Sequence, residues 1–385
     1  MSIPLLGPAW LPVAIALYGL ALCILQHCVL RRVPSTDDSR WTVAGILGAC
    51  FGALLAPDPW IGALLLTLAL SVPLSLLRFP THTTILAFPV DGATILLMAS
   101  AWVVALGLLT AALRQSGSVT LFLVGLLALC AYTIVVGVLQ VYRGLTCIVV
   151  TDALFYNQPI GTPVRVPTAF LHNSWKATAL HALALPVACA LSWPLGWQTP
   201  PLVLLIVGML WHLWKAEGET CLAAAGVGLL AFGWASGLAL PVLVVAPLSL
   251  VAYPGFRARV LSNPRWGAWR RGLDYWKRSG WLGAGVGAWP ALHIMTPEEP
   301  GRVWKQAHNE YLETLVDAGP VPVLCTVGYL GTALWRAWGG LPPIEAGLFG
   351  SLIGLAVLSV GYMPWRSWPI NLYALGLLAC WEALR

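Results

Sequence analysis

The sequence predicts an all-α, polytopic integral membrane protein with about twelve transmembrane helices. Of its 385 residues, 59% are hydrophobic and 9% are charged, and the mean hydropathy is +0.80. Soluble domains are far less apolar. Apolar runs such as AWLPVAIALYGLALCILQHC recur along the chain, and each can cross a hydrocarbon core that needs about 20 residues. The alternating pattern of membrane β-barrel strands is not visible, so helices are expected to satisfy the backbone.

The predicted spans recur along the whole chain. The first apolar run has neither a basic segment before it nor a small-residue cleavage site, so we interpret it as a retained helix rather than a signal peptide. Frequent Pro and Gly residues do not argue against spans, because membrane helices tolerate them. No soluble domain is expected at either end, and residues 1–385 are interpreted as one transmembrane domain. Hydropathy places the spans at residues 9–30, 41–56, 59–77, 92–113, 118–141, 173–194, 199–214, 221–236, 238–253, 311–333, 343–361 and 370–384.

Several kinds of site are not predicted. The nine cysteines are scattered through apolar segments without metal-ligand spacing, so buried, inert thiols are expected and neither a disulfide framework nor a metal site is. The run GAGVG at 283–287 has no strand before it and no helix after it, so it is interpreted as a turn rather than a dinucleotide fingerprint. No cofactor is predicted.

The longest polar interruption spans residues 254–310. It contains nine of the 21 basic residues and four acids, a net charge of +5, together with six tryptophans. The positive-inside tendency would place such a loop in the cytoplasm, whereas the alternative is that its charge serves an anionic ligand. Tryptophan favours membrane interfaces and also stacks on sugar rings. The loop is therefore expected to be partly helical and to lie along the membrane surface over a site.

The stretch QAHNEYLETLVDAG at 306–319 holds the most suggestive polar side chains. His308 could accept a proton near neutral pH, because imidazole titrates near 6.5. Asn309 is a good N-cap, and Glu310 and Glu313 suit the positive end of a helix dipole. The helix terminus disfavours imidazolium and the acids favour it, so the direction of the pKa shift stays open. The alternative is that His308 and Asn309 only cap a helix.

Two arginines are candidates for binding phosphate, whose oxygens match the planar guanidinium fork. Arg265 lies in RWGAW, and Arg165 lies in RVPTAFLHNSWKATAL, just ahead of a predicted span. The alternative for each is that it marks a membrane edge, as most such arginines do.

Three segments together resemble the bacterial O-antigen ligase and Wzy-type polymerase superfamily, which includes pilin-directed O-oligosaccharyltransferases. AHNEYLETLVDAG looks like the family's His-Asn-x-x-Leu…Glu-x-Gly element, with Asp317 where glutamate is usual. RWGAWRRGLDYWKRSGWLGAGVGAW looks like its Arg-x-x-x-Trp stretch followed by a Gly-x-Gly-x-Gly turn. RVPTAFLHNSWKATALHALALP is similar to its Arg…Phe…Asn element. The resemblance spans residues 165 to about 375 and rests on the order of the three elements.

The resemblance implies a GT-C-like membrane glycosyltransferase of the bacterial inner membrane, with loop 254–310 and its active site facing the periplasm. The implied donor is a glycan linked to undecaprenyl diphosphate, and the reaction is inverting and uses no metal. Arg165 and Arg265 would bind the pyrophosphate, and His308 would be the catalytic base, with Asn309 or Asp317 orienting that end of the helix. No nucleic acid is an expected partner. Further substrate-binding residues are expected to be Asn309, Arg270, Arg271, Trp269 and Tyr311.

The acceptor stays open among lipid A core, another lipid-linked glycan and a pilin hydroxyl, with a slight preference for the ligase reaction. WKAEGET stands where the family has a Ser-Arg-Gly element, and this difference bears on the acceptor. A transporter of lipid-linked glycans would bind the same diphosphate without a base, although its cationic residues would be expected on several spans rather than in one loop. A purely structural membrane protein is a third alternative.

Overall fold

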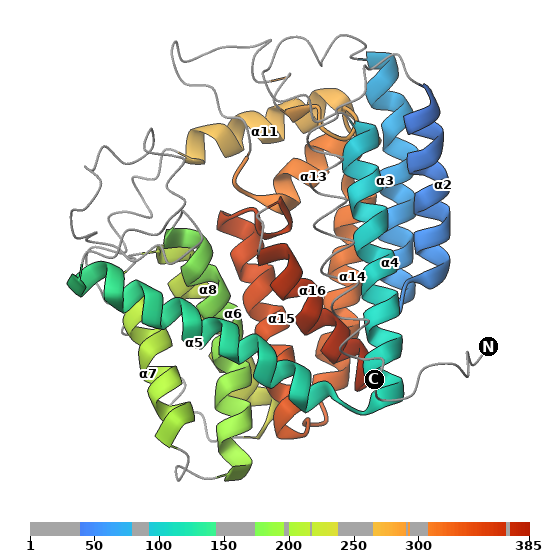
Figure 1. Cartoon of the computed structure of the whole chain (residues 1–385). Helices are drawn as coiled ribbons and strands as arrows, with labels where there is room; N and C mark the ends of the chain where they lie inside the picture. Colours follow the sequence, from blue (N-terminus) through green and yellow to red (C-terminus); the bar gives the residue numbers. More distant parts are fainter. Residues whose placement is uncertain are drawn as a thin grey trace. The chain divides into compact units, whose positions relative to one another are not determined.

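The computed structural model describes the chain as a set of helices (Figure 1). The described ranges are 39–78, 92–143, 174–195, 200–215, 218–237, 265–289, 292, 307–366 and 370–385. Within these ranges there is no β-strand, so the all-α prediction is confirmed for this part of the chain. Contacts divide the chain into two compact units, one formed by 1–117, 264–332 and 385, and the other by 118–263 and 333–384.

The first unit contains three apolar helices that pack against one another (Figure 1). They are α2 (Ser39–Leu55), α3 (Pro59–Arg78) and α4 (Gly92–Ser116). Helix α3 begins after Asp58, whose Oδ1 accepts a hydrogen bond from the Trp60 backbone N–H at 2.8 Å. This is the N-cap arrangement that short polar side chains provide. Asp58 also forms an ion pair with Arg385.

Two shorter helices of the first unit carry the polar residues of interest, and most of a further helix, α14 (Pro320–Ala337), also belongs to this unit. The two shorter helices are α11 (Arg265–Ser279), which lies across the direction of α2 and α3 in Figure 1, and α13 (Glu310–Ala318). Val286, from the glycine-rich turn after α11, and Ala318, at the end of α13, join a buried apolar cluster with Ala49, Leu65 and Leu96 of the three long helices. The apolar helices therefore anchor the turn and α13.

The second unit is a bundle built around α15 (Pro343–Gly361), which packs on α6 (Ser174–Leu195) and α8 (Glu219–Ala235). Small residues allow close approach: a Cβ on Gly350 would lie 2.5 Å from the Gly228 carbonyl oxygen. The Ser351 hydroxyl donates to the Leu183 carbonyl at 2.6 Å. Both features are typical of helix pairs in membranes. The other helices of this unit are α5 (Val119–Arg143), α7 (Pro200–Lys215) and α16 (Ile370–Ala383), with a short 3₁₀ helix η3 (Pro364–Arg366).

Most predicted spans coincide with helices to within about three residues, but one does not. The prediction of a single span at 311–333 is wrong, because α13 ends at Ala318 and α14 (Pro320–Ala337) begins two residues later. Gly319 separates them with φ +79° and ψ −171°, a conformation that no helix contains. The predicted spans at 9–30 and 238–253 lie outside the described residues.

Among the described residues, Val119–Arg143 and Pro343–Gly361 are long and apolar enough to cross a membrane, judged by length and composition. Six shorter apolar helices accompany them. Large apolar side chains are exposed along α5, including Leu121 at 69% and Val124 at 50%. A lipid environment would cover such surface, which water disfavours. The helices therefore fit a membrane protein, while the number of spans stays a prediction.

Candidate functional site

The candidate site lies in the first unit, where α11, the glycine-rich turn and the start of α13 meet. Helix α11 buries one face, formed by Ala268, Gly272 and Tyr275. A Cβ at Gly272 would lie 2.8 Å from the Trp289 ring and 2.9 Å from a Leu312 methyl carbon, so a glycine is needed for this close approach. A second buried cluster, formed by Tyr275, Trp289, Ala307, Leu312 and Val316, joins α11 to α13.

Helix α13 begins as the sequence predicts. Asn309 is its N-cap: the backbone is extended, with φ −153°, and the side-chain Oδ1 accepts from the Leu312 N–H at 3.0 Å. Glu310 and Glu313 lie in the first turn, and both are buried. Tyr311 is half-buried in the same turn. The predicted cap is therefore confirmed, and the residue before it, His308, is placed at the mouth of the helix.

His308 has a strained backbone. Its φ is +51°, and it is the only non-glycine residue with a positive φ in the part of the chain that the structure describes. The left-handed region costs a non-glycine residue about 1–2 kcal/mol. Such strain persists only where neighbouring groups hold it, and it is often found at functional sites.

The imidazole of His308 is neutral at physiological pH. Burial, the larger cause, and the positive charge of Arg265 together lower the pKa of His308 from its usual 6.5 to about 4. Both effects disfavour imidazolium. Arg265 is the first residue of α11, more than 40 positions earlier in the chain. The structure therefore brings the predicted base and one predicted phosphate-binding arginine close enough to interact electrostatically.

The glycine-rich turn is held by α13. The Ala284 and Gly285 N–H groups donate to the Val316 and Asp317 carbonyls, each at 2.7 Å. Gly283 has φ +70°, and a Cβ there would lie 2.5 Å from the Asp317 carbonyl oxygen, so only glycine fits. The turn is thus a docked segment of fixed conformation.

The Asp317 carboxylate completes this docking. Its Oδ2 accepts from the Gly287 N–H at 2.9 Å, and its Oδ1 accepts from the Trp289 N–H at 3.3 Å. Asp317 is 2% exposed. A buried carboxylate needs such donors, because an unpartnered charge is very costly in the interior. Asp317 therefore orients the turn.

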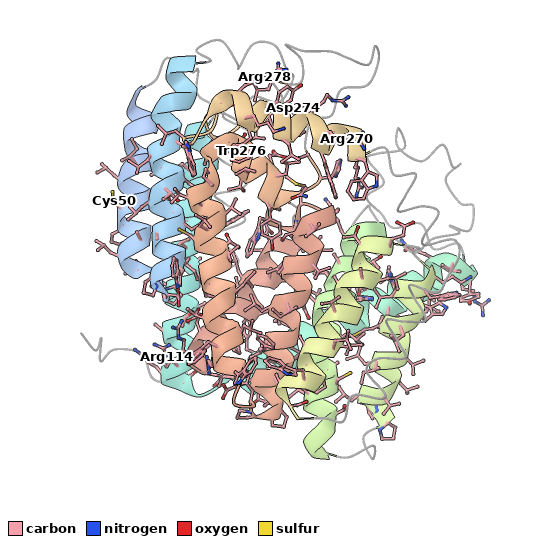
Figure 2. The ribbon with its side chains drawn as sticks, turned by 180° about the vertical axis from the view of Figure 1, so that it is seen from behind. Cys50, Arg114, Arg270, Asp274, Trp276 and Arg278 are labelled. Atoms are coloured by element: carbon pink, nitrogen blue, oxygen red, sulfur yellow. The ribbon has the colours of Figure 1, made fainter. Side chains whose placement is uncertain are left out.

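The remaining predicted residues occupy different surroundings. Trp269 lies one turn after Arg265 on α11, and its indole N–H donates to the Ala307 carbonyl at 2.8 Å. Arg270 is exposed, as are Asp274 and Arg278 further along α11 (Figure 2), and Arg271 is partly buried. Arg165 lies outside the described residues. No group of three or more His, Cys, Asp or Glu side chains in the described ranges could hold a metal ion.

Three hydrogen bonds of the site, made by Glu313 and Asp317, could not be assigned from the sequence. Glu313 accepts the Ala307 N–H at 2.8 Å, and Asp317 accepts from residues 28 and 30 positions away. The only local signal was the i, i+4 spacing of the two acids, which places them on one face of α13. That spacing does not reveal which backbone groups they meet.

Residues 194–327 match a family described as O-antigen ligase. The match includes Arg265, the glycine-rich turn and His308, and it stops short of Arg165. No curated protein matches the chain. The predicted resemblance to the O-antigen ligase superfamily is confirmed for this segment. The match supports an O-antigen ligase or polymerase type of function, and members of the family are glycosyltransferase-like membrane ligases.

Proposed function

We propose that this protein transfers an oligosaccharide from a polyprenyl diphosphate to an acceptor hydroxyl at the extracytoplasmic face of the bacterial inner membrane. The observation that carries the proposal is the pairing of a neutral, conformationally held His308 with the cation Arg265. A group transfer from a diphosphate needs a base for the incoming hydroxyl and a positive charge for the leaving group. The family match supports the same class of reaction.

The reaction proceeds in one displacement. The acceptor oxygen attacks C1 of the first sugar, the bond from C1 to the phosphate oxygen breaks, and the electron pair leaves with the diphosphate. The acceptor proton passes to the His308 imidazole, which later releases it to water. Attack from the face opposite the leaving group inverts the anomeric centre. No oxidant, reductant or metal is required.

Arg265 stabilises the charge that develops on the departing diphosphate. A fixed guanidinium accelerates the reaction when it binds the transition state more strongly than the ground state. Arg165 is proposed to bind the same diphosphate, and Arg270 and Arg271 its outer oxygens or neighbouring lipid headgroups. Tyr311 and Asn309 lie beside His308 in the chain and are proposed to contact the acceptor end.

Anion binding also adjusts the base. A diphosphate beside Arg265 offsets the positive charge that disfavours imidazolium, so donor binding raises the pKa of His308 from its low value in the free protein. A general base works best when its pKa lies near the working pH. His308 thus becomes a stronger base when the donor is present.

The reaction is proposed to be O-antigen ligase-like, with transfer to the lipid A core. Transfer to a second lipid-linked glycan or to a pilin hydroxyl uses the same chemistry, and the productive acceptor distinguishes the three. The experiment uses purified full-length protein with a polyprenyl-diphosphate glycan and each acceptor in turn, without added metal. Wild type is compared with His308→Ala, Arg265→Ala and, as a control for losing one positive charge from α11, Lys277→Ala.

Transfer by wild type and Lys277→Ala, with loss in His308→Ala and Arg265→Ala, is the expected result. His308→Ala should still bind the donor, because the arginines remain. Donor binding without transfer to any acceptor by wild type would overturn the proposal in favour of a transporter of lipid-linked glycans. Full transfer by both His308→Ala and Arg265→Ala would show that neither residue takes part in the reaction.

A further inference from the structure

Both backbone polar groups of Ala307, the residue before His308, are held by side chains. The Ala307 N–H donates to Glu313 Oε2 at 2.8 Å, and the Ala307 carbonyl accepts from the Trp269 indole N–H at 2.8 Å. Ala307 and Glu313 are 1% and 0% exposed. The two bonds come from different elements, since Trp269 belongs to α11 and Glu313 to α13. The backbone entering His308 is therefore fixed between these helices.

The backbone leaving His308 is fixed as well. Asn309 has an extended conformation and caps α13 through its side chain. His308 thus lies between two fixed points, and its left-handed φ of +51° is the conformation that connects them. Release of one anchor would let His308 return to a commoner conformation, because the left-handed region is intrinsically unfavourable for it.

We propose that Glu313 is a positioning residue, which with Trp269 forms a clamp on the Ala307 backbone and thereby aims the His308 imidazole at the reacting hydroxyl. The proposal rests on the proposed function, in which His308 is the base. It extends that function because Glu313 makes no contact with substrate in the mechanism above and acts only through the backbone. It also gives Trp269 a structural partner in addition to any sugar that its ring contacts.

The clamp depends on a hydrogen-bond acceptor at position 313. A buried carboxylate forms a strong, charge-assisted bond with an N–H group. Glutamine keeps an oxygen in the same place, whereas methionine has a similar length without one. Glu313→Gln and Glu313→Met are therefore matched variants that separate the hydrogen bond from side-chain packing.

The kinetic test compares kcat, KM for the donor and donor affinity in these variants. Glu313→Met should lower kcat about 100-fold, because small displacements of a catalytic group have effects of this size. KM and donor affinity should stay within about twofold, because the diphosphate-binding arginines are untouched. Glu313→Gln should restore kcat to within about tenfold of wild type, as expected for a weaker, uncharged hydrogen bond.

Trp269→Phe tests the other side of the clamp. Phenylalanine keeps an aromatic ring in the cluster around Ala307 but removes the N–H donor. We expect kcat to fall about tenfold and the His308 backbone signal to move as in Glu313→Met. This variant also keeps the proposal testable if Glu313→Met does not fold.

A readout independent of transfer is the backbone chemical shift of His308 in the full-length protein, labelled at histidine. The signal is assigned by its loss in His308→Gln. It should report a left-handed conformation in wild type and Glu313→Gln, and it should move in Glu313→Met. If wild type transfers no glycan but the shift moves as expected, the proposed function fails while the clamp stands.

Two results would overturn the clamp. One is wild-type kcat in Glu313→Met with an unmoved His308 signal. The other is an equal loss of kcat, donor affinity and thermal stability in Glu313→Gln and Glu313→Met. That pattern would mean that Glu313 acts through its charge or by supporting the overall fold, and not through the hydrogen bond to Ala307.

Discussion

The protonation of His308 follows from its surroundings. Burial and Arg265 together lower the pKa of His308 to about 4, so the free protein holds a neutral imidazole across the neutral range. The acids beside it in the sequence would have favoured imidazolium, but the pKa of His308 is lowered, and Glu313 accepts a hydrogen bond from the Ala307 N–H. The balance that sequence reasoning left open is therefore decided by burial and by a residue on another helix.

The pH dependence of kcat/KM should report the low pKa of His308. Transfer needs the neutral imidazole, so kcat/KM should rise with pH through an inflection near 4 and be level from about pH 6 to pH 8. An ordinary histidine would give an inflection near about 6.5. Initial rates at subsaturating donor measure the profile. An inflection at the ordinary value would contradict the assignment of His308 as a buried base.

Arg265 should influence the titration of His308 directly. Removal of the positive charge in Arg265→Gln should raise the pKa of His308, because imidazolium would no longer be repelled. The histidine ring signals of labelled protein, followed against pH, measure the shift. Lys277→Gln removes an exposed charge that pairs with Asp274 at 3.4 Å and should leave the titration unchanged. Identical curves for wild type and Arg265→Gln would disprove the coupling.

At the scale of elements, α13 and the glycine-rich turn form one docked assembly. Gly319 ends α13 in a conformation open mainly to glycine, and a Cβ there would collide with the Trp281 carbonyl oxygen. Gly319→Ala should therefore lower the free energy of unfolding by about 1–3 kcal/mol and reduce transfer. Gly267→Ala is the matched control, because nothing lies within 4 Å of its Cβ position on α11. It should be neutral or slightly stabilising.

Thermal unfolding of the purified variants measures the difference. The comparison controls for the added methyl group, since both glycines lie in the first unit and only one has a positive φ. Equal melting temperatures for the two variants would argue against a rigid junction between α13 and α14.

The packing of α5, α6 and α7 allows a second prediction at this scale. Thr133 Oγ1 lies 2.6 Å from His181 Nε2, and the His181 and His212 rings meet edge to face at 4.4 Å between centroids. Neither ring nitrogen of the buried His212 has a hydrogen-bond partner among the described residues. An apolar group of similar shape can replace such a side chain at no cost or with a gain.

His212→Phe should therefore melt at the wild-type temperature or above it, and His181→Phe should melt lower because it removes the bond with Thr133. Both variants should keep wild-type transfer, since neither residue belongs to the site. A lower melting temperature for His212→Phe alone would mean that its nitrogens have a partner outside the described residues.

Hydropathy predicted most helices because burial in lipid requires long apolar runs, a property of the local sequence. It joined α13 to α14 because the apolar Leu315, Val316 and Ala318 lead directly into the apolar residues of α14, while the break depends on the backbone of Gly319. The Asn309 cap was also predictable, because a helix cap depends on the residue at that position and on the few residues that follow it. The bonds from Glu313 and Asp317 to the backbone were not, because the identity of a buried N–H partner depends on how α11 and the turn fold back onto α13.

At the scale of the whole molecule, two physical considerations disagree on which side of the membrane loop 254–310 faces. Its net charge of +5 favours the cytoplasm by the positive-inside tendency. A donor glycan carried across the membrane requires the site on the other side, and Arg265 and His308 lie in this loop. If the basic residues bind an anionic ligand, their role in binding outweighs the positive-inside tendency, and the loop faces the periplasm.

A single cysteine decides between these topologies. Arg278 is exposed at the end of α11 (Figure 2), so Arg278→Cys in a chain whose nine native cysteines are replaced gives one accessible thiol in the loop. A membrane-impermeant maleimide should label it from outside intact spheroplasts, and inverted vesicles should protect it. The converse pattern would place Arg265 and His308 in the cytoplasm, where no translocated donor could reach them, and the assignment of the basic loop to diphosphate binding would fail with the topology.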